Sequence, residues 1–183
     1  MHRYVLAAGL LAASGFAPAQ ATESFGKWEA TRGVTSRGTP FCAMHTAVRG
    51  QNVGQNVWIK HFQGREVLNV TMYKDSWLIP RGTDVPVVFD FANNEPLPLV
   101  GYGDGHIVDV EVPTQFIAAF LLALSERPVM QVAFPNGQEP TWTVPTARMG
   151  ANRAEEAFVR CIRAGRTQPY GAPNQTQPHG TAR

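Results

Sequence analysis

The chain has 183 residues, of which 44% are hydrophobic and 16% charged, and its formal net charge is +2. This composition excludes an intrinsically disordered chain, a coiled coil and a protein that binds nucleic acid through bulk basicity. Its two cysteines are too few for a disulfide-built miniprotein or a multi-cysteine zinc site. The length indicates a single domain.

The first 21 residues have the pattern of a secretory signal. Basic residues at 2–3 precede an apolar run over residues 5–13, and Ala19-Gln20-Ala21 has the small-x-small pattern that signal peptidase cleaves. An apolar run this short cannot cross a hydrocarbon core of about 30 Å, which argues against a membrane anchor. We therefore expect cleavage after Ala21 and an exported protein, periplasmic or extracellular, with no transmembrane segment.

The body of the chain reads as short β-strands separated by glycine, proline and asparagine. Apolar and polar residues alternate with a period of two, or form short apolar runs, over residues 41–48, 57–62, 67–73, 85–91, 106–112, 129–134 and 141–144. Gly101 to Gly105 is predicted to break this pattern, with Asp104-Gly105 in a tight turn. We expect about eight or nine strands, mostly antiparallel.

Two helices interrupt the strands. The first is predicted over residues 115–126, with Thr114 as its cap, and the second over residues 152–164. The helical spacing in the first places one set of residues on the sheet: Phe116, Ala119, Phe120 and Ala123. The expected fold is mainly β (α+β), an antiparallel β-sandwich or flattened barrel with two packed helices, formed by residues 22–165. Residues 166–183, rich in proline, glutamine and glycine, are predicted to be a disordered tail.

The two cysteines are predicted to form a structural disulfide. Cys42 lies in a predicted strand near the start of the domain, and Cys161 lies on the core-facing stripe of the last helix. In an oxidising compartment, two such cysteines most simply form one bridge, the alternative being two separate buried thiols. A redox role is not favoured, because the chain has no C-x-x-C motif.

No recognised catalytic or metal-binding motif is present. His45, His61 and His106 fall in different strands without the spacing of a zinc site, so we expect neither a metal nor a cofactor. Cys42 and His45 are three residues apart on one strand, which directs them to opposite faces and prevents a nucleophile–base pair.

Aromatic residues are the most informative candidate binding residues. Trp58 shares one strand face with Lys60 and Phe62, while the neighbouring Val57 and Ile59 take the other face. An exposed Trp–Phe pair would mark a partner surface, which we expect to include Trp77 and Tyr102 as well; the alternative is that a helix covers this face too.

The order of these features resembles the invasion-associated locus B family of exported proteobacterial proteins. The similar segments are Phe25-Gly26-Lys27-Trp28, Phe41-Cys42-Ala43-Met44, Trp77-Leu78-Ile79-Pro80-Arg81-Gly82 and the Val132 to Gly137 hairpin, which together with both helices cover residues 25–162. The position of Cys161 and the tail depart from the pattern. The resemblance implies a compact β-rich envelope protein, associated in some members with host-cell invasion, and it carries over no catalytic residues.

Together these observations predict a non-enzymatic envelope protein that binds another envelope or host protein and does not bind nucleic acid. A periplasmic carrier of a small molecule or lipid, with the aromatic residues lining a cavity, is the alternative. A hydrolase with an unrecognised site comes third. Asp109 and Glu111, about 7 Å apart on one strand face, could serve glycoside hydrolysis, although a solvated acidic face explains them more simply.

Overall fold

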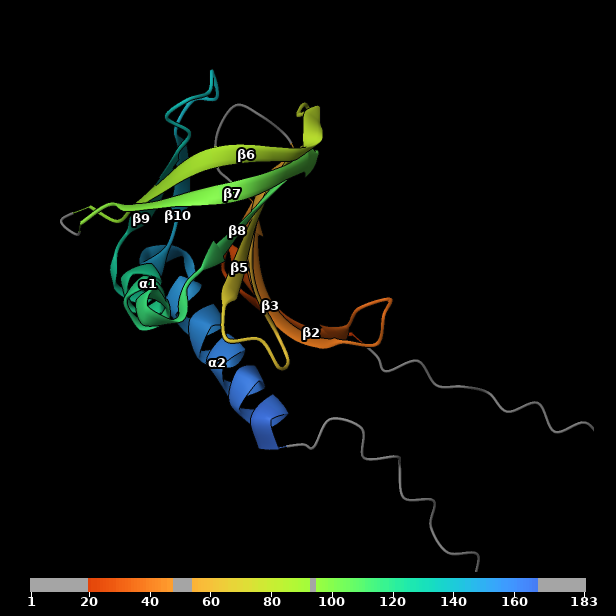
Figure 1. Cartoon of the computed structure of the whole chain (residues 1–183). Coiled ribbons are helices and arrows are strands. Elements are labelled where there is room, and N and C mark those ends of the chain that lie inside the picture. Colours follow the sequence, from red (N-terminus) through yellow and green to blue (C-terminus); the bar gives the residue numbers. More distant parts are fainter. Residues whose placement is uncertain (1–19, 48–53, 93–94, 168–183) are drawn as a thin grey trace, which may run out of the picture.

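A computed structural model describes residues 20–47, 54–92 and 95–167. Its strands form one antiparallel sheet in the order β1-β2-β3-β4-β5-β8-β7-β6-β9-β10, curved into a half-barrel around two helices (Figure 1). The strands are β1 (Ala21–Phe25), β2 (Trp28–Val34), β3 (Pro40–Ala47), β4 (Gln55–Phe62), β5 (Leu68–Lys74), β6 (Ile79–Asp90), β7 (Leu97–Gly105), β8 (Ile107–Val112), β9 (Val129–Ala133) and β10 (Trp142–Pro145). The two α-helices are α1 (Thr114–Glu126) and α2 (Ala151–Thr167), and a short 3-10 helix, η1 (Ala147–Met149), precedes α2.

The mainly β, antiparallel fold with two packed helices is confirmed. The described residues form 10 strands, more than the eight or nine expected, and these strands make a single sheet rather than the two sheets of a sandwich. The flattened-barrel alternative therefore lies closer to the structure. Three strands fall outside the seven segments with a strand pattern: β1, β2 and β7.

Strand β7 exists because two of its glycines make room for neighbouring side chains. A Cβ at Gly103 would lie 2.4 Å from Ile79 Cγ2, and a Cβ at Gly101 would lie 2.7 Å from Val108 Cγ1. Both contacts are far shorter than carbon atoms tolerate, so no other residue fits without displacing the wall of the half-barrel. The predicted break over Gly101 to Gly105 is therefore wrong, although the chain does turn at Gly105, which has φ of 60°.

The core lies between the inner face of the sheet and the two helices. The Phe120 ring of α1 meets two other rings edge-on. Its centroid lies 5.4 Å from that of Phe89 in β6 and 5.3 Å from that of Phe91, the residue after β6. The face predicted for α1 is only partly right: Phe120 and Ala123 are buried, but Phe116 and Ala119 are exposed. The predicted cap is also wrong, because the Thr114 hydroxyl donates to the Glu66 carbonyl instead.

The two ends of the curved sheet are joined by side-chain and turn contacts rather than by strand pairing. The Trp28 indole of β2 donates a hydrogen bond of 2.7 Å to the Pro145 carbonyl at the end of β10. In the β1–β2 turn, the Lys27 N–H donates to the Met149 carbonyl at 2.8 Å. Here the backbones touch directly, since a Cβ at Gly150 would lie 1.8 Å from the Phe25 carbonyl oxygen. This contact fixes the start of α2 against the first strands.

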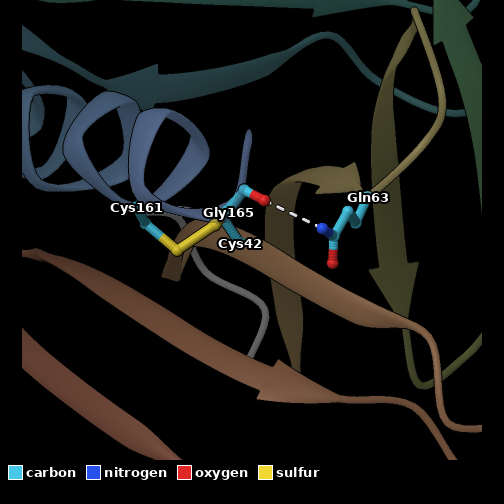
Figure 2. Close-up of a disulfide and its surroundings, with 4 residues drawn as sticks. All are labelled: Cys42, Gln63, Cys161 and Gly165. Carbon is cyan, nitrogen blue, oxygen red and sulfur yellow. Dashed lines mark hydrogen bonds between the residues drawn. A yellow bond between two sulfur atoms is a disulfide. The ribbon is translucent and has the colours of Figure 1, made fainter. Parts of the chain in front are cut away.

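The predicted disulfide is confirmed. Figure 2 shows Cys42 of β3 bonded to Cys161 of α2; their Cα atoms are 6.0 Å apart and they are 119 residues apart in sequence. Beside the bridge, the Gln63 side chain donates to the Gly165 carbonyl at 2.8 Å. In the chain-entropy model a bridge closing a loop of this length stabilises the fold by up to about 5 kcal/mol. Helix α2 is thus attached to the sheet near both of its ends.

Two predicted segments fall largely outside the described residues. These are residues 1–19 of the secretory signal and residues 168–183 of the tail. Helix α2 continues to Thr167, beyond the helix end predicted at residue 164. Within the described ranges, no helix is long and apolar enough to cross a membrane.

Candidate functional site

The face of the sheet directed away from the helices, here called the outer face, carries most of the predicted binding residues. Val57 and Ile59 of β4 are completely buried on the inner face, so strand alternation places Trp58, Lys60 and Phe62 on the outer face. This confirms the predicted sharing of faces along β4. No described helix packs on the outer face of β4, since α2 contacts the inner side of β2 and β3 through residues such as Cys161.

Trp58 is held in place by its neighbours. Its indole stacks on the His45 imidazole with ring centroids 3.7 Å apart, and its N–H donates to the Asn56 side-chain oxygen at 3.0 Å. The Lys60 ammonium lies 5.7 Å from the centroid of the Trp58 ring. Because His45 covers one face of the indole, Trp58 is a fixed part of the surface rather than an open stacking platform.

Polar contacts extend from Trp58 across five strands. Register pairs place Glu29, His45, Trp58, Thr71 and Asp109 side by side across β2, β3, β4, β5 and β8, and we call this line the polar row. The Nε2 atom of His45 lies 3.3 Å from the Oε2 atom of Glu29. Burial lowers the pKa of His45, and the Glu29 carboxylate opposes that effect only in part, so His45 is neutral at pH 7.

Lys60 is tied to the same row. Its ammonium donates to the Thr71 hydroxyl at 3.0 Å, and Thr71 donates in turn to the Asp109 carboxylate. Burial lowers the pKa of Lys60, an effect that the nearby Asp109 charge opposes. Asp109 is therefore engaged in a hydrogen-bonded network, and Glu111 pairs with Arg65 at 2.8 Å. The carboxylates of Asp109 and Glu111 therefore both have structural partners within the sheet or beside it.

Tyr102 belongs to an apolar part of the outer face. It is 47% exposed, and Val100, two residues earlier on β7, is 63% exposed. Val100 pairs with Pro86 of β6, and Pro98 precedes it on the same face; we call these four residues the β6–β7 patch. Tyr102 also pairs in register with Asp109, so the patch adjoins the polar row directly.

Trp77 lies elsewhere. Its indole stacks on Trp142 with centroids 5.1 Å apart and meets the Phe134 ring edge-on at 5.6 Å, packed against the core. The structure thus brings Trp58, Lys60, Phe62 and Tyr102 onto one face of the sheet and places Trp77 in a separate aromatic cluster. Leu78, next to it in the chain, is a strongly exposed apolar residue.

A carboxylate that sequence reasoning missed organises this cluster. Glu139 accepts two hydrogen bonds from the Lys74 ammonium, at 2.8 and 2.7 Å, and one each from the indoles of Trp142, at 2.7 Å, and Trp77, at 3.0 Å. The Lys74 and Glu139 side chains are only 14% and 13% exposed. We call these four residues the Glu139 clasp. In the sequence, Lys74 precedes Trp77 by three residues and Glu139 precedes Trp142 by three residues. These local spacings do not indicate a site by themselves, because only the fold brings the two pairs together.

The pKa of Glu139 reflects this arrangement. Burial alone would raise it, but the hydrogen bonds from Lys74, Trp142 and Trp77 outweigh burial and lower the pKa below its ordinary value. The carboxylate is therefore ionised throughout the neutral range. It fastens the segment between β9 and β10 to the end of β5.

The remaining chemistry of the described residues is limited. Cys42 is consumed in the disulfide and is not available as a nucleophile. In the described ranges, no group of three histidine, cysteine, aspartate or glutamate side chains is placed to hold a metal ion.

Comparisons with known proteins leave the class of the protein to be argued from its geometry. No protein-family model matches the chain, and neither the curated proteins nor the solved structures contain a significant match.

Proposed function

We propose that this chain is an exported, non-enzymatic cell-envelope protein that binds another envelope or host protein through the outer face of its sheet. The observation that supports this proposal is the β6–β7 patch, in which Val100 and Tyr102 are 63% and 47% exposed beside the polar row. Exposed apolar residues that include an aromatic and have polar residues at their margin are typical of protein interfaces.

The rigidity of the surface also supports a binding role. Both β6 and β7 are paired over most of their length, and β7 pairs with β8 on its other side. Trp58, Lys60 and Asp109 are held by hydrogen bonds and stacking before any partner arrives. A surface that is already ordered loses little conformational entropy on binding.

Export belongs to the same proposal and draws support from the disulfide, because such bonds persist in oxidising compartments. Cleavage after Ala21 would leave Thr22 as the first residue and retain four of the five residues of β1. The intact mass of the protein isolated from its cells tests this directly. A mass that includes residues 1–21 would contradict the export proposal. The family resemblance, which is part of the same proposal, favours a host protein as the partner.

Site-specific photocrosslinking tests the binding surface. We would place a photoreactive amino acid at Tyr102 and, as a matched control, at Leu122, an exposed apolar residue of α1. The proposal predicts a discrete protein adduct from position 102, either in intact cells or when these cells contact host cells, and none from position 122 in either setting. An adduct from position 122 alone, or no adduct from either, would contradict it. Val100→Asp should abolish the adduct without changing the melting temperature.

A further inference from the structure

A cavity of about 370 Å³ lies beside the Glu139 clasp, between strand β6 and the segment that joins β9 to β10. Its volume falls within the range of small-molecule sites in proteins. Its walls are largely apolar, formed by Trp77, Ile79, Val85, Val108 and Phe134. Three of these, Trp77, Ile79 and Val85, pack against the core yet remain only partly buried. Apolar surface is therefore left open inside a concave site.

The cavity is built from rigid parts. The clasp fixes Glu139, which lines the cavity, to Lys74 and two indoles. On the other side, Gly103 lets Ile79 pack directly against the backbone of β7. Because the walls are held by hydrogen bonds and close packing, the cavity is present before a ligand enters, and binding requires little reorganisation.

The charges of the lining favour a cation. Two acidic residues, Asp84 and Glu139, are part of the lining, Asp84 at its outer edge, and the lining contains no lysine, arginine or histidine. Lys74, which is not part of the cavity lining, balances the charge of Glu139. Asp84 is exposed and its side chain has no ion pair or hydrogen bond within the described part of the chain. The rim of an aromatic cavity therefore carries an uncompensated negative charge.

We propose that this cavity binds a small organic ammonium ion, with its cationic head at the carboxylate rim and its apolar carbons against Ile79, Val85 and Val108. Aromatic rings and an unpaired carboxylate both attract a cation, and the surrounding apolar walls reject a strongly hydrated inorganic ion. The cavity shares Pro86 with the β6–β7 patch, and Asp84 pairs in register with Tyr102, but the binding of a small cation does not depend on the partner proposed for the patch.

Choline and its neutral isostere 3,3-dimethylbutan-1-ol provide the test, because they share shape and differ in charge. Calorimetric titration of the disulfide-bonded protein should show saturable binding of choline, about tenfold tighter than that of the alcohol. Equal affinity for the two would overturn the cation proposal, as would no saturable binding of choline. Vesicles of phosphatidylcholine, titrated separately, should give no binding; if they alone bound, the ligand would be a lipid headgroup and the proposal of a free ion would be wrong.

Three variants locate the site. Asp84→Asn should weaken choline binding several-fold, while Asp90→Asn, a matched change on the same strand outside the cavity lining, should leave it unchanged. Val85→Phe, which adds a ring to the cavity wall, should abolish binding, with thermal melting used to verify that each variant is folded. Equal effects of the two aspartate changes would indicate unspecific charge attraction and overturn the assignment, and so would full binding by folded Val85→Phe.

Discussion

Replacing Glu139 by glutamine tests the least exposed ion pair among those of the described residues. The substitution preserves the shape of the side chain but removes its charge and turns one acceptor oxygen into a donor. The Lys74 ammonium, 14% exposed, then loses its counter-charge, and at least one of the indole or ammonium donors faces another donor. Breaking a buried ion pair from one side costs about 3–5 kcal/mol. Since some solvent reaches the pair, we expect Glu139→Gln to lower the free energy of unfolding by about 3 kcal/mol.

A surface pair in the same sheet provides the control. Glu111 accepts a hydrogen bond of 2.8 Å from Arg65, but both side chains are 52% exposed. Glu111→Gln should therefore cost less than about 1 kcal/mol. Urea denaturation at pH 7, followed by tryptophan fluorescence, measures both variants. The Lys74→Met/Glu139→Gln double variant should recover part of the loss, because no unpaired charge then remains. If Glu139→Gln costs no more than Glu111→Gln, or if the double variant loses the sum of the single losses, the clasp does not stabilise the fold as argued.

Three further predictions follow from contacts in the sheet. Cys42→Ser should lower the free energy of unfolding by up to about 5 kcal/mol, and adding reductant to the wild-type protein should reproduce the loss; a change below about 1 kcal/mol would contradict the loop-closure argument. Gly103→Ala should cost about 1–3 kcal/mol in a thermal or urea melt, because its Cβ would lie 2.4 Å from Ile79 Cγ2. Gly165→Ala, whose Cβ meets nothing within 4 Å in helix α2, should cost nothing, and equal losses for the two variants would contradict the packing argument. Because its pKa is lowered in the folded state, His45 contributes stability that is complete above the unfolded value of about 6.5 and is lost as pH falls through the folded pKa. The wild type should therefore lose more free energy of unfolding than His45→Gln between pH 7 and 5. Parallel curves of stability against pH for the two proteins would refute this.

The parts of the structure that the sequence predicted well depend on local periodicity. Val57 and Ile59 are buried opposite Trp58 because a strand directs alternate side chains to opposite faces, whatever the rest of the fold. The disulfide was also predictable, since only two cysteines were present and both lay at core-facing positions. Residues 154, 158 and 161 of α2 face inward for the same periodic reason.

The parts that were missed depend on contacts between distant segments. Gly101 and Gly103 suggested a turn, but Val108 and Ile79 occupy the space that their side chains would have filled. Lys74 and Glu139 are 65 residues apart and show no local pattern that joins them. Trp77 was grouped with Trp58 because both are tryptophans near predicted strands, whereas tertiary packing places it on Trp142. Such information resides in the topology of the sheet, which residue spacing does not determine.

The attachment of α2 to the first strands has a consequence for the order in which the protein can be made. The Trp28 indole donates a hydrogen bond to a carbonyl that lies 117 residues later in the chain, and Cys42 is bonded to a cysteine 119 residues later. A ribosome therefore releases β2 and β3 long before the groups that complete their packing exist. The early strands cannot reach their final state one at a time, and folding must await release of the last helix. Such non-local pairing gives slow folding, on the millisecond-to-second scale, and leaves strand edges open to association in the meantime. The bridge can form only after Cys161 has been made, so the fraction of bridged protein in a cell measures how much of it has joined β3 to α2.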